Sequence, residues 1–240
     1  MADTIRHSNT PPEILVYKLI DSILDYLQEN IRDNALEPKK MVLYDILSDM
    51  NLKKHNYFEE GKELFSRNRD EHERAVDIRQ FFDAARAKDP TIHITLSSDN
   101  QGGDNSIGLS TDEFVYEEDY TFDDVEGTRT ADVSGRSFET SLQLVFTSSN
   151  HHEVMVMYYV IRALLISTFS SLELEGFQNI KFSGRELQIN ETLAPNLYSR
   201  GLSLSGFYEV RVRDHNMVNR IKEFFIEKST PYLTEETEIK

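Results

Sequence analysis

Cysteine is absent from this sequence of 240 residues. Disulfides, thiolate nucleophiles and cysteine-ligated zinc or iron–sulfur clusters are therefore excluded. The fold must be held together by packing alone, which suits a reducing cytosol. With 39% hydrophobic residues, the chain is long enough to bury a substantial core.

Long apolar runs are scarce as well. The residues from Met1 to Thr10 lack the basic-then-apolar pattern of a signal peptide. The most apolar stretch, Val154 to Phe169, is interrupted by Arg162 and is shorter than the roughly 20 residues that a membrane-spanning helix needs. We therefore expect a buried helix at this position, a soluble protein and no membrane partner.

The commonest catalytic and cofactor motifs are also missing. The sequence contains no G-x-S-x-G elbow, no G-x-x-x-x-G-K-[ST] phosphate loop, no G-x-G-x-x-G fingerprint and no H-E-x-x-H zinc motif. These absences remove the usual signatures of hydrolases, nucleotide-binding proteins and metalloproteases. We expect a binding or assembly protein, not an enzyme, with no catalytic residue and no cofactor.

Two segments resemble metal sites only superficially. His151, His152 and Glu153 are adjacent, whereas metal ligands on a helix usually lie three or four residues apart. The loop from Asp99 to Asp104 offers oxygen donors but lacks the donor rhythm and the closing Glu of a helix–loop–helix calcium site. We predict no metal site, and weak calcium binding at Asp99–Asp104 stays open as the alternative.

Positive charge is scarce, and the negative charge is concentrated in one segment. The net charge is -16, from 26 basic and 42 acidic residues. Between Asp99 and Gly135 there are eleven Asp or Glu and a single Arg, Arg129, which gives a local charge of -10. Such a chain repels the phosphate backbone, so we predict no specific nucleic-acid binding.

The N-terminal region, residues 1–90, is predicted to be helical. The sequence Thr10-Pro11-Pro12-Glu13 has the form of a capping box with proline at the start of a helix. Apolar residues then recur at helical spacing: Leu15, Leu19, Ile23, Tyr26, Leu27 and Ile31. A second helix is expected over 42–52. Further helices are expected within 57–88, with a thin apolar face at Leu64, Phe65, Ala75, Ile78, Phe81, Phe82 and Ala85.

The region 91–230 is predicted to be an α+β core. Alternating residues predict strands over 91–97 and 137–149. A long helix should follow, capped by an Asn150-x-x-Glu153 box and ended at Glu175-Gly176. Strands are expected over 177–182, 186–192 and 202–213, with a kink near Gly206, then a helix over 217–228 and a flexible acidic tail, 231–240. This order predicts a mixed, mostly antiparallel sheet packed against helices.

The acidic insertion, residues 99–135, is predicted to be a long loop or hairpin with aromatic anchors. Because dense carboxylates usually mark solvent or a basic partner, we regard its centre as the candidate interface. The candidate residues are Tyr116, Glu117, Glu118, Asp119, Tyr120, Phe122, Asp123 and Asp124. The aromatic residues among them either contact a partner or anchor the loop to the protein itself.

The stretch from Arg136 to Asp214 resembles a known family. It contains R-S-F-E-T-S-L-Q-L-V-F-T-S-S-N, a helix ending L-E-L-E-G-F, then I-K-F-S-G-R-E-L and Y-S-R-G-L-S-L-S-G-F-Y-E-V-R-V. This order of elements and apolar spacing resembles the strand–helix–strand core of the neck, tail-completion and tail-terminator proteins of tailed bacteriophages. The similarity covers about a third of the chain. The long acidic insertion and the helical stretch before it depart from the compact members.

The resemblance implies a virion subunit that is assembled in the host cytoplasm. Such a subunit would self-associate into a ring of six or twelve copies and join portal, neck and tail proteins, with the acidic segment facing either a DNA channel or a partner. The alternative is an intracellular adaptor or regulatory domain that presents the acidic loop to a basic protein. A ring protein should form a large cyclic oligomer, whereas an adaptor should stay a monomer or dimer.

Overall fold

The computed structural model describes residues 10–52, 56–69, 71–80, 89–101, 114–122, 125–186 and 197–214. Within these ranges, the side chains of residues 101–136, 186, 209 and 211–214 are not described. The chain divides into two compact units. Unit 1 comprises residues 1–101 and 138–208, and unit 2 comprises residues 102–137 and 209–240. The predicted helix 217–228 and tail 231–240 lie outside the described residues.

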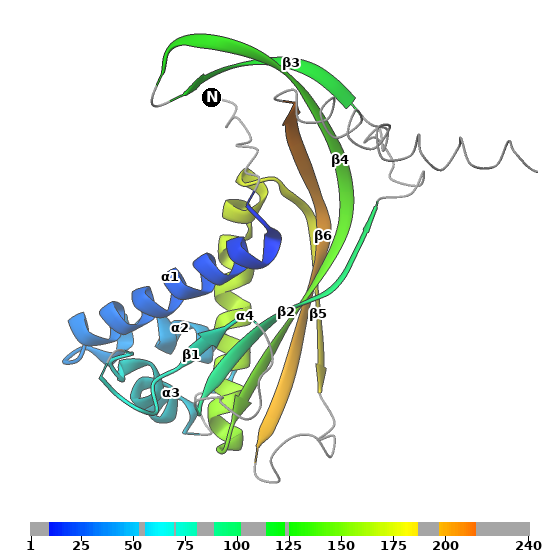
Figure 1. Ribbon diagram of the computed structural model, residues 1–240. Helices are drawn as coiled ribbons and strands as arrows, with labels where there is room; N and C mark the ends of the chain where they lie inside the picture. Colours follow the sequence, from blue (N-terminus) through cyan, green and yellow to red (C-terminus); the bar gives the residue numbers. More distant parts are fainter. Residues whose placement is uncertain are drawn as a thin grey trace, which may run out of the picture. The chain divides into compact units, whose positions relative to one another are not determined.

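The helices and strands follow the predicted α+β pattern (Figure 1). The helices are α1 Pro12–Asp33, η1 Pro38–Lys40, α2 Val42–Asp49, α3 Tyr57–Ser66 and α4 His151–Leu174. The strands are β1 Asp77–Arg79, β2 Thr91–Gln101, β3 Phe114–Phe122, β4 Val125–Ser148, β5 Phe177–Glu186 and β6 Tyr198–Asp214.

The sheet has the strand order β1-β2-β4-β6-β5, and β3 pairs with β4 off this path. The β1–β2 pair is parallel, whereas β2–β4, β3–β4 and β5–β6 are antiparallel. The predicted fold class, a mixed sheet packed against helices, is therefore confirmed. In unit 1 the helices lie on one side of the sheet (Figure 1).

Alternation along β4 decides which side of the sheet becomes the core. Leu142, Leu144 and Phe146 are fully buried, and Leu144 and Phe146 are paired with Ile94 and Ile92 of β2. Because successive residues of a strand point to opposite faces, these apolar side chains share one face, which meets the helices. The predicted strand 137–149 is confirmed, and β4 begins earlier than predicted, at Val125.

Helix α4 is the centre of this core. Its predicted start and stop are both confirmed, because Asn150 Oδ1 accepts a hydrogen bond from the His152 amide at 2.9 Å and Gly176 takes a φ of +97°. Among the described helices, α4 alone is long and apolar enough to cross a membrane by length and composition. In this fold Val156, Val160 and Ile161 of α4 are fully buried in the core of unit 1.

The N-terminal helices share this core with the sheet. Residues of α1, α2 and α3 form one apolar cluster with residues of α4, β2, β4 and β6. Helix α3 comes especially close to α4 at Gly61, where a Cβ atom would lie 2.9 Å from the Cγ1 of Val156. The glycine at this position therefore allows a close contact that any larger residue would obstruct.

Helix α1 is where predicted, but two of its details are wrong. Pro11 occupies the N-cap, Thr10 lies outside the helix, and no side chain caps the first turn, so the predicted capping box does not form. Tyr26 is 49% exposed. The buried face combines Leu15, Ile23, Leu27 and Ile31 of the predicted stripe with the neighbouring positions Val16, Ile20 and Leu24, so it is broader than one stripe.

The charged region 57–88 is only partly helical. Helix α3 is confirmed, and its residues Leu64 and Phe65 are buried. Ile78, however, belongs to the short strand β1, which pairs in parallel with β2. The backbone groups of this segment find partners at the edge of the sheet, so the predicted helix is wrong here. Phe81, Phe82 and Ala85 lie outside the described residues.

The irregularity predicted near Gly206 is found in the strand beside it. Between the pairs Gln178–Phe207 and Lys181–Ser205, two residues of β5 oppose the single residue Gly206 of β6. This is a β-bulge, and its residue Asn179 adopts a φ of +53°. A Cβ at Gly206 would lie 2.7 Å from the Gln178 carbonyl oxygen, so glycine is needed opposite the bulge. Strand β5 also continues to Glu186, so the predicted break before 186 does not occur, and 187–196 lie outside the described residues.

Tyr208 links strand β6 in unit 1 to Thr10, just before α1, by a hydrogen bond. Its hydroxyl donates a hydrogen bond to the Thr10 carbonyl oxygen at 2.5 Å, and its side chain is 3% exposed. Burial, followed by the charges of Glu175 and Glu13, raises the pKa of Tyr208 to about 12. The neutral phenol is therefore favoured in the folded protein.

A pH dependence arises from this raised pKa. Above the usual tyrosine value of about 10, the unfolded chain loses the phenol proton while the folded chain keeps it until about pH 12. The stabilisation is thus complete below about pH 10 and is lost as the pH rises through the folded value. Urea unfolding between pH 9 and 11.5 should show a steeper loss of stability in the wild type than in Tyr208→Phe. Equal slopes would contradict this prediction.

Candidate functional site

The candidate interface lies in an antiparallel hairpin of unit 2, formed by β3 and the first part of β4. Residues 114–121 are paired with 135–128, and the register shifts before the pair Phe122–Val125. Tyr116, Glu117, Glu118, Asp119, Tyr120 and Phe122 all belong to β3. Asp123 and Asp124 lie outside the described residues. We call residues 114–122 and 125–135 the acidic hairpin.

The register assigns the candidate residues to two different faces of the acidic hairpin. Residues that are directly paired across an antiparallel ladder share a face, and neighbours along a strand do not. Tyr116 pairs with Val133, Glu118 with Ala131, and Tyr120 with Arg129. One face therefore carries both tyrosines and most of the apolar positions.

The opposite face of the acidic hairpin carries the excess negative charge. Glu117 pairs with Asp132, and the next position on the same face is Asp119, which pairs with Thr130.

A buried polar cluster lies at the start of α4 in unit 1. The Glu153 side chain is 5% exposed and accepts hydrogen bonds from Arg67 at 3.1 Å, Arg74 at 3.2 Å and the Ser148 hydroxyl at 2.6 Å. The predicted capping box is therefore only half right. Asn150 caps the helix, but its own amide donates to Ser148 Oγ at 3.1 Å, and Glu153 is engaged by the two arginines.

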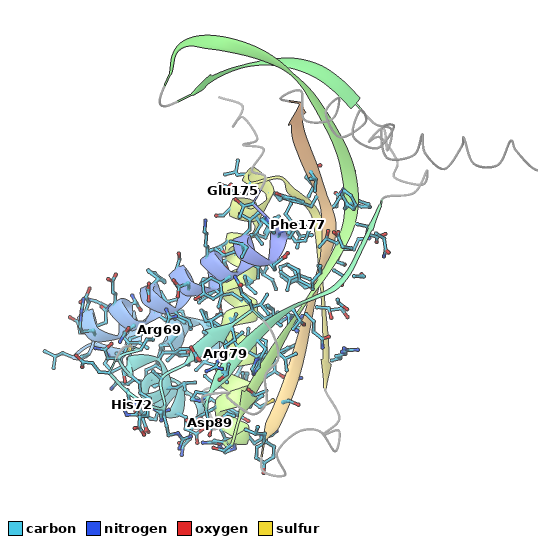
Figure 2. The ribbon with its side chains drawn as sticks, viewed as in Figure 1. Arg69, His72, Arg79, Asp89, Glu175 and Phe177 are labelled. Atoms are coloured by element: carbon cyan, nitrogen blue, oxygen red, sulfur yellow. The ribbon has the colours of Figure 1, made fainter. Side chains whose placement is uncertain are left out.

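Asp89 extends this cluster to the loop before β2, as labelled in Figure 2. It accepts hydrogen bonds from the Ser149 amide, at 2.9 Å, and from the Ser149 hydroxyl. Burial raises its pKa, but the hydrogen bonds from Ser149 and Ser148 and the charge of Arg74 outweigh that effect, so the net pKa is lowered. The charged groups of this cluster are therefore paired with one another within unit 1.

His151 and His152, the adjacent histidines of the sequence, make different contacts. His152 Nδ1 lies 2.9 Å from Glu60 Oε1, whereas the His151 ring packs edge-on against Tyr198 at a centroid distance of 5.3 Å. Asp99 accepts a hydrogen bond from Thr140 Oγ1 at 2.7 Å, and residues 102–104 of the loop lie outside the described residues. Over the described part of the chain, no group of three or more His, Asp or Glu is arranged to hold a metal ion.

A polar cleft of about 390 Å³ lies between α1 and the segment before β1. It is lined by Asp21, Asp25, Gln28, Asn68, Arg69, Ala75, Val76 and Asp77. Arg69, labelled in Figure 2, crosses the cleft to Asp21 at 2.6 Å and Asp25 at 3.0 Å. Burial lowers the pKa of Arg69, but hydrogen bonds and charges from these two carboxylates outweigh it and raise the pKa overall. The carboxylates are therefore occupied by a cation of the protein itself.

No family model matches this chain, and no curated protein is significantly similar to it. A function for this chain is therefore inferred from the geometry of the described residues. It offers a two-faced acidic hairpin in unit 2 and internally neutralised polar clusters in unit 1.

Sequence reasoning identified the acidic hairpin by composition but missed the Glu153 cluster. The sequence did carry a signal for this cluster. Glu153 lies in the first turn of a helix that follows a buried strand, and an acidic residue at that position is buried when another segment packs over the helix end. Its partners Arg67 and Arg74 lie about 80 residues away in the sequence, so only the fold brings them together.

Proposed function

We propose that this chain is a non-enzymatic structural subunit that self-associates into a ring at the neck or head–tail junction of a tailed bacteriophage, where it joins portal and tail components. The proposal rests on the similarity of residues 136–214 to the core of that family. The strand–helix–strand order that carries the similarity corresponds to β4, α4, β5 and β6.

The observation that best supports an assembly role is the two-faced acidic hairpin. One face carries Tyr116 and Tyr120, and the other carries Glu117, Asp119 and Asp132, as the strand register requires. Tyrosine is enriched at the centres of protein interfaces, and patches of one charge select oppositely charged partners. A ribbon with both properties is suited to contacting two different surfaces, as a subunit between neighbours in a ring must do.

The proposal predicts a closed oligomer in solution. The purified full chain, measured by light scattering during size exclusion and by native mass spectrometry over a range of concentrations, should give a mass of six or twelve chains. A closed ring should keep one discrete mass as the concentration rises, because a cyclic interface leaves no free end. A protein that stays a monomer or dimer throughout the range would contradict the ring and favour the adaptor role.

A further inference from the structure

Strand β5 is an edge of the sheet, at the end opposite β1 in the strand order (Figure 1). Among the described strands, only β6 pairs with it. Beyond the β-bulge near its start, β5 is paired regularly with β6 from Lys181 to Glu186, and Lys181, Ser183, Gly184 and Arg185 are exposed. The outer backbone groups of a regular edge strand are a template for one more strand. An extended segment of about six residues would match this edge in length.

An apolar stripe of α4 runs beside this edge. A Cβ atom at Gly184 would collide with the Tyr158 hydroxyl, so Tyr158 marks the side of α4 that packs against β5. Arg162, Ile166 and Phe169 follow Tyr158 at helical spacing on the same side. They continue toward the turn that connects α4 to the start of β5. Ile166 is 45% exposed and Phe169 is 40% exposed, so the stripe is open to solvent.

The open side of α4 also has little charge. Between Glu153 and Glu173 the sequence carries a single charged residue, Arg162. The exposed positions of α1, in contrast, include Asp25 and Glu29. Since a solvated helix side is normally polar, exposed apolar side chains on a side without carboxylates are typical of a docking surface. A strand added beside β5 would place every second side chain on this stripe.

The other face of the β5 edge carries positive charge. Phe182 is paired with the buried Leu204 and therefore faces the helices, so its neighbours in the alternation, Lys181 and Arg185, lie on the opposite face. Arg185 lies across the sheet, because its Nη2 donates a hydrogen bond to Gln143 Oε1 of β4 at 2.9 Å. The alternate residues of an added strand would lie directly opposite these two cations.

These charges distinguish between two occupants of the edge. A second copy could pair its β5 with this one about a two-fold axis, and the symmetric register that pairs Lys181–Arg185 throughout is centred on Ser183. That register places Lys181 of one copy opposite Arg185 of the other, and like charges in this position destabilise a pair of strands. A segment with acidic residues at these positions is attracted instead, so charge complementarity favours an acidic partner.

We propose that the β5 edge binds an extended segment of a partner protein, which adds to the sheet as a further strand. The segment alternates, with acidic residues opposite Lys181 and Arg185 and apolar residues toward Ile166 and Phe169. Hydrogen bonds between the backbones supply affinity, and the alternating side chains supply specificity. This inference does not rest on the proposed ring, because the occupant belongs to a different chain.

The probe is a fluorescent, acetylated and amidated peptide, Ile-Asp-Val-Thr-Val-Asp-Ile. Its sequence reads the same in both directions, so a parallel or an antiparallel strand places its acids opposite Lys181 and Arg185 and its valines beside Phe182 and Gly184. Fluorescence anisotropy with the full wild-type chain should show saturable binding. The scrambled peptide Asp-Asp-Ile-Val-Thr-Val-Ile should bind at least about tenfold more weakly, because it cannot separate acidic and apolar residues onto two faces. No saturable binding of the alternating peptide up to about 1 mM overturns the inference.

Charge reversal tests the acidic face of the occupant. Lys181→Glu/Arg185→Glu should bind the probe at least about tenfold more weakly and should bind Ile-Lys-Val-Thr-Val-Lys-Ile in its place. The control variant, Arg32→Glu/Lys39→Glu, makes the same change of charge at exposed positions of α1 and the turn after it and should bind like the wild type. Circular dichroism melting verifies that each variant folds. Equal weakening in both variants would mean that net charge, not the β5 edge, governs binding, and would overturn the inference.

Removal of the apolar stripe tests the other face. Ile166→Ser/Phe169→Ser should weaken binding of the probe about tenfold, because its apolar residues lose their contact surface. The control variant, Tyr26→Ser/Leu36→Ser, removes two apolar side chains that are 49% and 97% exposed outside α4 and should bind like the wild type. A stripe variant that is folded and binds as tightly as the wild type contradicts the inference.

Two further measurements separate strand addition from other contacts. Of two probes that are N-methylated at alternate amides, one should lose binding and the other should keep it, because only one set of amides faces β5. If both bind like the parent peptide, no strand is added and the inference fails. If Lys181→Glu/Arg185→Glu lowers the oligomer mass without the probe, the edge joins copies of this chain, which overturns this inference and leaves the ring standing. A wild type that is monomeric at every concentration overturns the ring alone.

Discussion

Replacing Glu153 with glutamine is expected to lower the free energy of unfolding by about 3 kcal/mol, because it leaves a buried cation without its counter-charge. The Glu153 and Arg67 side chains are 5% and 12% exposed, so water cannot replace the missing carboxylate. Arg74 and Ser148 lose the same acceptor. Glutamine has nearly the same shape, so the change isolates the charge from the packing.

A matched control is available on the same arginine. Glu63 lies 3.0 Å from Arg67 but is 74% exposed, so Glu63→Gln should cost less than about 1 kcal/mol. Both variants are compared with the wild type by urea unfolding at neutral pH. If the two substitutions were equally costly, burial would not be the reason that Glu153 matters, and the cluster would contribute no more than a surface ion pair.

Truncation of Phe146 to alanine is expected to cost about 3–5 kcal/mol. Phe146 is fully buried on the core face of β4, is paired with Ile92, and packs edge-on against Tyr158 at a centroid distance of 5.8 Å. Alanine would leave a cavity between the sheet and α4, beside the Tyr158 ring.

The control for this change lies on the same strand. Ser141 is paired with Ser98 and is only partly buried, so Ser141→Ala should change stability by no more than about 0.5 kcal/mol. Thermal and urea unfolding of both variants provide the comparison. A small effect of Phe146→Ala would mean that the face of β4 that meets the helices is assigned incorrectly.

The acidic hairpin shows how much of the candidate site could be predicted from the sequence. Composition alone pointed to Tyr116, Glu117, Glu118, Asp119, Tyr120 and Phe122, because eleven acids cluster in one segment. It could not separate Glu118 from Glu117, although the strand register assigns them to opposite faces. A shift of one residue in pairing exchanges the two faces, and that pairing is a property of the folded hairpin.

The sequence by itself determined the elements whose signals are local. Helix α4 could be bounded because Asn150 caps it and Gly176 ends it, and the core strand of β4 could be recognised because Leu142, Leu144 and Phe146 alternate. Both signals depend on residues within one or two turns or a few strand positions of each other. The α+β class follows from their order.

Only the tertiary structure decided which of several locally equivalent partners each residue would take. Ile78 pairs in a sheet instead of continuing a helix, and Glu153 turns from its own helix cap toward Arg67. Arg200 of β6 stacks on the ring of Tyr158 of α4. These partners depend on burial and charge pairing between segments that are distant in the chain. Such long-range interactions outweigh local conformational preferences, which amount to about 1 kcal/mol or less per residue.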